Sequence, residues 1–469
     1  MLLSACGPAA NRYMLVDNHL RAREYKQADA VIQRAEEDYG AKNRVLYGMD
    51  RGMTLHLAGD YQQSNAVLEQ ADERIERLYT RSIRSESAAF MTNDYALPYE
   101  GDPYEQVMVN VVKALNYAAM DQWQDALVEA RRIDHRLNVI ADKTQDKGAY
   151  RDDGFVRYLC GILYESAGDI NNAFIAYRKA YETYQSTRGW SGMGVPGQLR
   201  VDLLRTADAL HLTQELADYQ SAFPESTWQT LQSQQHLAQV LVISYNGRAP
   251  HKEDQFLDLP LNMEALQLVL LNRGLSQTNR SLPSHRTVDS VLYGLQGRVV
   301  RVALPRLVPQ KTRVPVDHVF LINQEGNLIE MSTELAQDVT AMAEKALSER
   351  ITGITMKALA RAAFKYSLAE GATRGAQGAA GKDAAPWVGL LVGLFTKGLA
   401  VATEESDKRS WRTLPDEIHL ARRWVAPGQY RVKADHLIGG PGTTEPARSE
   451  RTLSLNAGET GIIIQRVVQ

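Results

Sequence analysis

Apolar and small residues recur along the first half of the chain at helical spacing. In four segments, an aromatic or aliphatic residue is followed by small or apolar residues three, seven and ten positions later. Such spacing places each set on one face of a helix, so each set predicts a helix that begins at its first member. The sets are Tyr25, Ala28, Ile32 and Ala35; Tyr61, Ser64, Leu68 and Ala71; Trp123, Ala126, Ala130 and Ile133; and Ile170, Ala173, Tyr177 and Ala180.

The repeated pattern resembles the tetratricopeptide repeat, an antiparallel helix pair with a period of about 34 residues. Tyr61 lies 36 positions after Tyr25, the later sets are separated by insertions, and a degenerate fifth pair is expected over about 195–223. Gly59 and Gly168 precede two of the helices, where a glycine ends a helix in the left-handed conformation. The alternative is a helical bundle with the same buried faces. We expect Ala126 and Ala173 at close helix crossings.

The pattern changes near residue 237 to short β-branched or alternating runs between turns, which predict strands. A helical stretch of residues 333–370, a Gly/Ala-rich loop of 371–385 and an apolar segment of 386–402 interrupt these strands. We therefore predict one β-rich domain that is interrupted by a helical hairpin. The expected strands are 239–245, 298–303, 319–322, 418–421, 430–434, 452–455 and 461–464.

The predicted fold class is α+β multidomain, with an N-terminal TPR-like α-solenoid followed by a β-rich, sandwich-like domain that a helical hairpin interrupts. The boundaries are 1–10 for an N-terminal lipobox and linker, 11–232 for the repeats, 237–332 for the first part of the β-rich domain, 333–405 for the hairpin and 406–469 for its second part.

The apolar segment 386–402 contains Trp387, Gly389, Gly393 and Phe395 as candidate assembly or membrane residues. It has 17 residues, which is short for a membrane-spanning helix of about 20 residues. Glycines four residues apart are typical of closely packed helices. We expect this segment to be a helix buried against 333–370, and membrane contact or self-association are the alternatives.

Composition and charge narrow the function. The chain has 469 residues and a net charge of -3, and this balance does not favour nucleic-acid binding. Two cysteines, Cys6 and Cys160, provide neither a disulfide framework nor a structural metal site. Residues 192–197 match G-x-G-x-x-G, but they follow a predicted helix and contain Pro196, so a nucleotide site is not expected. We find no catalytic constellation and predict no enzyme activity, no metal and no cofactor.

The first residues include Leu3, Ser4, Ala5 and Cys6, which resemble a bacterial lipobox. The resemblance implies export and lipid attachment to the Cys6 thiol. Only Leu2 and Leu3 remain of the apolar segment that a signal peptide needs, so the precursor is expected to start upstream. Since no Asp follows Cys6, the resemblance favours the periplasmic face of the outer membrane. The alternative is a cysteine near the N-terminus by chance.

The segment Ser406–Pro415 is rich in groups that hydrogen-bond or stack, namely Asp407, Arg409, Trp411 and Arg412. Two interpretations are open: a contact with a partner protein, or an internal network at a domain junction. Together with Tyr245–Pro250, the lipobox and the repeats, this segment resembles a poorly characterised family of proteobacterial envelope lipoproteins. That resemblance implies no established reaction and no cofactor.

These features predict a lipid-anchored scaffold in cell-envelope assembly or maintenance that binds a segment of a protein partner in the groove of the repeats. The alternative is a structural subunit of an oligomeric envelope or membrane-associated complex that uses the apolar segment 386–402.

Overall fold

The computed structural model describes residues 8–82, 95, 97–143, 152–260, 299–355, 358, 406–437, 444–446 and 451–468. The predicted lipid-attachment residue Cys6 lies outside them. The predicted assembly residues Trp387, Gly389, Gly393 and Phe395 also lie outside them.

The N-terminal half consists of TPR-like helical repeats, and the fold as a whole is α+β. The four residues predicted to open helices begin α2, α5, α8 and α10, which confirms the repeat spacing. The helices are α1 (Pro8–Arg21), α2 (Tyr25–Arg34), α3 (Glu36–Tyr39), the short 3-10 helix η1 (Ala41–Asn43), α4 (Arg44–Ala58), α5 (Tyr61–Ser82), α7 (Pro103–Ala119), α8 (Trp123–Lys143), α9 (Gly154–Ser166), α10 (Ile170–Ser191), α11 (Gly197–Ala209), α12 (Thr213–Ala222) and α13 (Leu231–Gln234).

Small residues allow the paired helices to approach closely. A Cβ on Gly161 of α9 would lie 2.3 Å from the Tyr177 ring of α10, so only glycine fits at this crossing. Ala126 and Ala173 are completely buried, as expected for close crossings. Gly59 ends α4 with a φ of 79°, the left-handed conformation that the sequence predicted there.

Eleven described strands form three sheets. The strands are β1 (Ala238–Asn246), β2 (His251–Pro260), β3 (Val299–Val308), β4 (Val316–Asn323), β5 (Leu328–Ser332), β6 (Glu334–Asp338), β7 (Glu417–Val425), β8 (Gly428–Leu437), β9 (Thr444–Pro446), β10 (Arg451–Leu455) and β11 (Thr460–Val467). One sheet has the order β11-β1-β7-β6, a second has β10-β8-β4-β5 with β9 paired to β8, and β2 pairs with β3 alone.

The central strand β1 explains how the layers fit together. Leu241, Ile243 and Tyr245 belong to the core of the helices, whereas Val240 and Val242 belong to the core shared with the five-stranded sheet. Successive side chains of a strand point to opposite faces, so the β11-β1-β7-β6 sheet lies between the helices and the second sheet. Both faces of β1 are therefore buried, which accounts for its nearly continuous apolar sequence.

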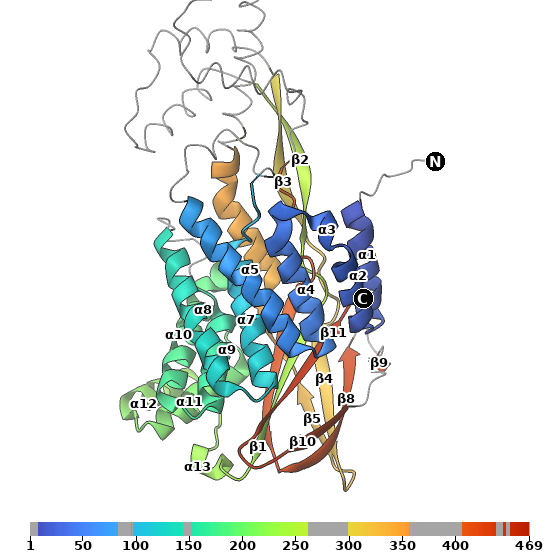
Figure 1. Ribbon diagram of the computed structural model, residues 1–469. Coiled ribbons are helices and arrows are strands. Elements are labelled where there is room, and N and C mark those ends of the chain that lie inside the picture. The colour runs from blue at the N-terminus through green and yellow to red at the C-terminus, as the bar shows by residue number, and fades with distance from the viewer. Residues whose placement is uncertain are drawn as a thin grey trace, which may run out of the picture.

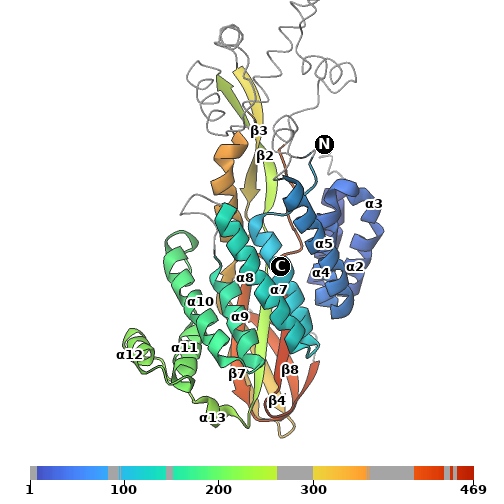
Figure 2. The ribbon, with the colours of Figure 1, turned by 60° about the vertical axis from the view of Figure 1, so that its left-hand side comes forward.

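The views in Figures 1 and 2 show the same arrangement. The helices stack along one side of the sheets, from α2 and α3 at one end to α12 at the other. The β2–β3 ribbon leaves this body and projects beyond the helices at one end of the molecule (Figure 1). Phe256 on this ribbon is 57% exposed, in keeping with its position outside the main core.

The expected helix over 333–370 begins later than predicted. Residues 334–338 form strand β6, which pairs with β7, and the following helix covers residues 339–355. Residues 334–338 form a strand because they pair with the first part of β7, from Glu417 to Leu420, and bury Ala336. Val339, Met342 and Ala346 are buried on the following helix, at spacings of three and four residues that place them on one face. The partner expected for this helix, residues 386–402, lies outside the described residues.

Candidate functional site

The inner face of the helical repeats, where we expected a partner segment, is covered by this chain itself. Residues 406–416 run across the first repeats without regular structure, and β7 and β6 cover the later ones. The backbone N–H of Trp411 donates to Glu105 of α7 at 2.7 Å, and the Thr413 hydroxyl donates to Asp50 of α4 at 3.0 Å. The groove is therefore an internal interface in this structure.

The predicted partner-contact residues lie along this internal segment. Arg409 holds Asp407 through two nitrogen atoms at 2.8 and 2.7 Å and also donates to the Leu97 carbonyl. Trp411 is completely buried, and its indole N–H donates to Thr413. Arg412 stacks on the Tyr13 ring and stays partly exposed. In this structure the contacts of Trp411 and Arg409 are internal, and both side chains are buried.

A second junction joins β7 to the last repeats. The Arg422 guanidinium lies 2.7 Å from Glu165 of α9 and 3.0 Å from Asp202 of α11, and Arg205 binds the same two carboxylates. All four side chains are almost completely buried. Burial alone would raise the pKa of Asp202, but the charges of Arg422 and Arg205 hold it below its ordinary value. This balanced quartet fixes the sheet on the helices.

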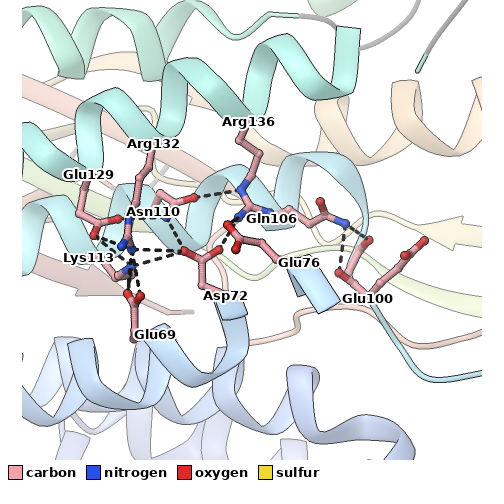
Figure 3. Close-up of polar contacts among 11 residues, drawn as sticks. Glu69, Asp72, Glu76, Glu100, Gln106, Asn110, Lys113, Glu129, Arg132 and Arg136 are labelled. Carbon is pink, nitrogen blue, oxygen red and sulfur yellow. Dashed lines mark hydrogen bonds and ion pairs between the residues drawn. The ribbon is translucent and has the colours of Figure 1, made fainter. Parts of the chain in front are cut away.

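A third polar cluster lies between repeats and is shown in Figure 3. Lys113 of α7 is 1% exposed and lies 3.0 Å from Glu129 and 3.4 Å from Asp72. Glu69 also pairs with Lys113 and accepts from Arg132 of α8. These carboxylates hold the pKa of Lys113 above its ordinary value against the effect of burial. Every charge here has an opposite partner, so the cluster stabilises the contact of α5, α7 and α8.

An open cleft lies between β5 and β7. Strand β7 pairs with β1 along its whole length, but β6 covers its other side only from Glu417 to Leu420. At Thr333 the chain passes from β5, in one sheet, to β6, in the other, and Thr333 exchanges hydrogen bonds with Asp317. The two sheets separate there, so no described strand pairs with this side of residues 421–425. The resulting cleft has a volume of about 640 Å³.

The lining of this cleft is mainly polar, and strand edges form its walls. It is lined by Gln198, Leu328–Ser332, Glu334 and Ala421–Arg423. Arg423 crosses the cleft and donates to the Glu330 carbonyl at 2.9 Å. Glu334 accepts from the backbone N–H groups of Gly197 and Gln198, so it caps α11. Leu328, one of the lining residues, is 59% exposed. The site offers backbone donors and acceptors and one strongly exposed apolar side chain, that of Leu328.

The buried titratable groups in the described residues serve the fold. Burial and the nearby Asp102 charge raise the pKa of Glu105 to about 7, yet Glu105 is enclosed by Tyr99, Asp102 and Trp411. Burial raises the pKa of the Cys160 thiol to about 12, which makes a reactive thiolate unfavourable. Within the described ranges, no group of His, Cys, Asp and Glu side chains is arranged to hold a metal ion. No described helix is long and apolar enough to span a membrane.

Sequence reasoning missed the junction of β7 with the last repeats and the β5–β7 cleft, whereas it left the internal network of residues 406–415 open as one of two interpretations. One signal was available: polar residues occur on helix faces that are otherwise apolar, such as Asp50, Asn116 and Asp202. Buried polar groups need hydrogen-bond partners, so these residues indicated a further polar surface against the helices. Nothing in the sequence of β5 or β7 indicated that one edge would be open.

The fold defines a TPR-like repeat protein. Solved structures with distant similarity to this chain include three proteins. The chain is similar to the crystal structure of MamA. The sequence identity is 13%, the match covers 45% of this chain and 93% of that chain, and the TM-score is 0.29. It is similar to the TPR-like repeats of a putative Podosopora anserina kinesin light chain. The sequence identity is 12%, the match covers 46% of this chain and 96% of that chain, and the TM-score is 0.29. It is also similar to the crystal structure of BtubC from P. vanneervenii. The sequence identity is 13%, the match covers 47% of this chain and 83% of that chain, and the TM-score is 0.32.

These likenesses are too distant to assign a partner or an activity. No family model matches the sequence, and no curated protein matches it.

Proposed function

We propose that this chain is a non-catalytic scaffold that binds an extended segment of a partner protein along the open edge of β7. The observation that carries this proposal is the unpaired side of residues 421–425 beside the cleft lined by β5. An exposed strand edge presents N–H and C=O groups that another chain can pair with. In a strand, the N–H and C=O groups of every second residue point toward the same edge. A partner strand added at that edge can therefore form a regular series of backbone hydrogen bonds.

The chemistry of the cleft favours a polypeptide over a small apolar ligand. Its lining includes the charged residues Glu330, Glu334 and Arg423, and its one strongly exposed apolar side chain is Leu328. An extended peptide would take backbone hydrogen bonds from the edge and place one side chain against Leu328. The internal position of residues 406–416 supports this location, because the groove of the repeats is occupied.

The proposal includes a location in the bacterial cell envelope, with a lipid on Cys6 at the periplasmic face of the outer membrane and a role in envelope assembly or maintenance. Its support is the resemblance of Leu3–Cys6 to a lipobox. Helix α1 begins at Pro8, so an anchor on Cys6 would hold the folded body close to the bilayer. The alternative, a subunit of an oligomeric complex that uses residues 386–402, depends on a segment outside the described residues.

The absence of an enzymatic activity is also part of the proposal. Its support is the pairing of the buried charged groups: Lys113, Arg205 and Arg422 each lie against carboxylates that hold them in the fold. Of these three residues, only Arg422 lines the β5–β7 cleft, and its guanidinium is bound by Glu165 and Asp202.

A photocrosslinking experiment tests the binding site. A photoreactive amino acid is placed at Leu328, which is 59% exposed in the cleft, and at Val128, which is 40% exposed on α8 as a control. We expect a protein adduct from position 328 and none from position 128. The crosslinked peptide is then synthesised and titrated against purified protein. Leu328→Lys should weaken its binding at least about tenfold, because it replaces the strongly exposed apolar contact of the cleft by a charge, whereas Val128→Lys should not.

Binding of the peptide that Leu328→Lys leaves unchanged would contradict the proposed site. Adducts from both positions at equal yield would contradict it as well, since they would indicate nonspecific contact.

A further inference from the structure

Helix α1 exposes a stripe of residues without charge. The exposed side chains between positions 11 and 18 are those of Asn11, Met14, Leu15 and Asn18, and these positions share one face of the helix. Met14 is 57% exposed and Leu15 is 47% exposed, although both side chains are large and apolar. These four residues, which we call the α1 stripe, therefore present two neighbouring apolar groups between two neutral amides.

The exposed faces of the other long helices differ in character. Helices α5, α8 and α10 expose charged side chains, such as those of Glu73, Arg131 and Lys179. A single exposed apolar residue, such as Val128 on α8, is ordinary at a protein surface. Two neighbouring apolar residues in a stripe without charge leave more apolar surface against water. The α1 stripe thus suits an environment that is less polar than bulk water.

The stripe cannot turn toward the core, because the opposite face of α1 is packed. Tyr13, Val16 and Leu20 are buried there, and the Tyr13 hydroxyl donates to Asp50 of α4 at 2.6 Å. Rotation of α1 about its axis would expose these apolar side chains and remove a donor from the buried Asp50 carboxylate. The stripe is therefore a fixed part of the surface, and any cover must come from outside the described fold.

The position of α1 in the chain indicates what that cover is. Cys6, the proposed lipid-attachment residue, lies two positions before Pro8, where α1 begins, and two residues span at most about 7 Å. Met14 and Leu15 follow Pro8 by six and seven residues, which is roughly 9–11 Å along a helix. A lipid on Cys6 would thus hold both side chains within about 20 Å of the anchored residue.

We infer that the α1 stripe lies in the bilayer interface beside the anchor, with the Met14 and Leu15 side chains among the lipid headgroups and the upper acyl chains. An interfacial helix buries its apolar face by about 5–10 Å at this boundary. The amides of Asn11 and Asn18 hydrogen-bond with polar headgroup atoms. The inference rests on the lipid attachment that is part of the proposed function, and it adds a second, noncovalent membrane contact. It does not involve the β5–β7 cleft, because none of these residues lines that cleft.

A depth measurement tests this position. Lipidated protein is purified from cells that express the native precursor, mass spectrometry establishes whether Cys6 carries acyl groups, and the protein is reconstituted in phosphatidylcholine vesicles. An environment-sensitive fluorophore is attached to the Met14→Cys variant, and to the Val128→Cys variant as the control on α8. Cys160 does not interfere, because its thiol is buried. Lipids that carry a doxyl group should quench the fluorophore at position 14 and not at position 128.

The outcomes separate this inference from the lipid attachment. If Cys6 carries acyl groups but quenching is absent or equal at the two positions, the inference alone is wrong. Emission shifted to shorter wavelength at position 14 without quenching would also overturn it, because it would indicate that a second copy of the chain covers the stripe. A Cys6 without acyl groups would contradict the lipid attachment and, with it, the inference.

Substitutions measure the contribution of the stripe. A single acyl chain binds a bilayer reversibly, so the full chain is coupled at the Cys6 thiol to a one-chain lipid and sedimented with phosphatidylcholine vesicles. Met14→Gln and Leu15→Gln together should weaken binding about tenfold or more, because they remove the apolar surface that enters the interface. Val128→Gln should leave binding unchanged, and all three positions are exposed, so the variants retain the fold. Unchanged binding in the double variant, or equal weakening by Val128→Gln, would refute the membrane contact.

Discussion

The Nη1 atom of Arg422 on β7 lies 3.0 Å from the Oδ2 atom of Asp202 on α11, and both side chains are completely buried. The two residues are 220 positions apart, so this pair joins the last repeats to the central sheet. Glu165 and Arg205 complete the quartet and balance its charge. The helices and the sheet therefore share one polar junction as well as one apolar core.

The first prediction concerns this junction. Arg422→Met should lower the free energy of unfolding by about 3–5 kcal/mol, because it leaves two buried carboxylates with only Arg205 to neutralise them. Urea denaturation followed by circular dichroism measures the change. The neighbouring Arg423→Gln is the control, since Arg423 is exposed and only its bond to the Glu330 carbonyl is lost. Equal stability of the two variants would show that the quartet does not support the interface.

A second prediction follows from Glu105. Its pKa is about 7 in the folded protein, raised by burial and by the Asp102 charge from an ordinary value of 4.5. The folded state holds this proton more tightly than the unfolded state. Its contribution to stability is thus complete below pH about 4.5 and is lost as pH rises through about 7. Each pKa unit corresponds to about 1.4 kcal/mol, so the loss amounts to a few kcal/mol at most.

Glu105→Gln tests this dependence because it removes the titrating group. The difference in unfolding free energy between wild type and Glu105→Gln should change across pH 4.5–7, with the wild type losing stability relative to the variant. Asp102 titrates nearby and its pKa is lowered, so the comparison of the two proteins at each pH is the decisive measurement. A difference that stays constant across this range would contradict the raised pKa.

The third prediction concerns the cluster of Figure 3. Lys113→Met should lower the free energy of unfolding by about 3–5 kcal/mol, since the three carboxylates around Lys113 then retain only Arg132 and Arg136. Arg77→Gln, on the exposed side of α5, removes a positive charge without this burial and should change stability little. Thermal denaturation of both variants measures the effect, and similar melting temperatures would show that the cluster contributes little.

The repeat helices and most strands could be predicted from sequence because their patterns are local. The spacing after Tyr25, Tyr61, Trp123 and Ile170 reflects one buried helix face, and all four helices begin at these residues. Strand β2 was missed because its sequence, from His251 to Asp258, is largely polar and pairs only with β3 in a ribbon outside the core. A two-stranded ribbon does not need the apolar alternation that marks a core strand.

The candidate sites could not be predicted because they depend on long-range contacts. Residues 406–416 were recognised as rich in polar and stacking groups, but their position against Asp50 and Glu105 depends on how the sheet packs on the repeats. The open edge of β7 arises from the change of sheet at Thr333, which sets where pairing with β6 stops. Neither feature can be predicted from local sequence patterns.

A fourth prediction tests the close helix crossings. Ala126→Leu and Ala173→Leu should each lower the free energy of unfolding by roughly 1–3 kcal/mol, because both positions are completely buried and an added side chain overpacks them. Val128→Leu, on the same helix as Ala126 but 40% exposed, is the matched control and should have little effect. Urea denaturation reports the three values. Unchanged stability in both alanine variants would argue against the predicted packing of α8 and α10.

The last prediction concerns lipid attachment to Cys6. The Leu3–Cys6 sequence resembles a lipobox, and Cys6 lies two residues before α1, so an acyl group there would not disturb the described fold. Cells that express the native precursor are labelled with an alkyne fatty acid, and we expect labelling of the wild type and its loss in Cys6→Ala. Cys160→Ala is the matched control: Cys160 is buried against α8, so the variant should be labelled like the wild type.

Membrane fractionation then follows the same three proteins. A full set of acyl chains holds a protein firmly on a bilayer, whereas one chain binds only reversibly, so the wild type and Cys160→Ala should stay with the outer membrane after a salt wash while Cys6→Ala is released. Equal labelling of wild type and Cys6→Ala would rule out this cysteine as the anchor, and the β5–β7 cleft would then have to be tested for partners without regard to the envelope.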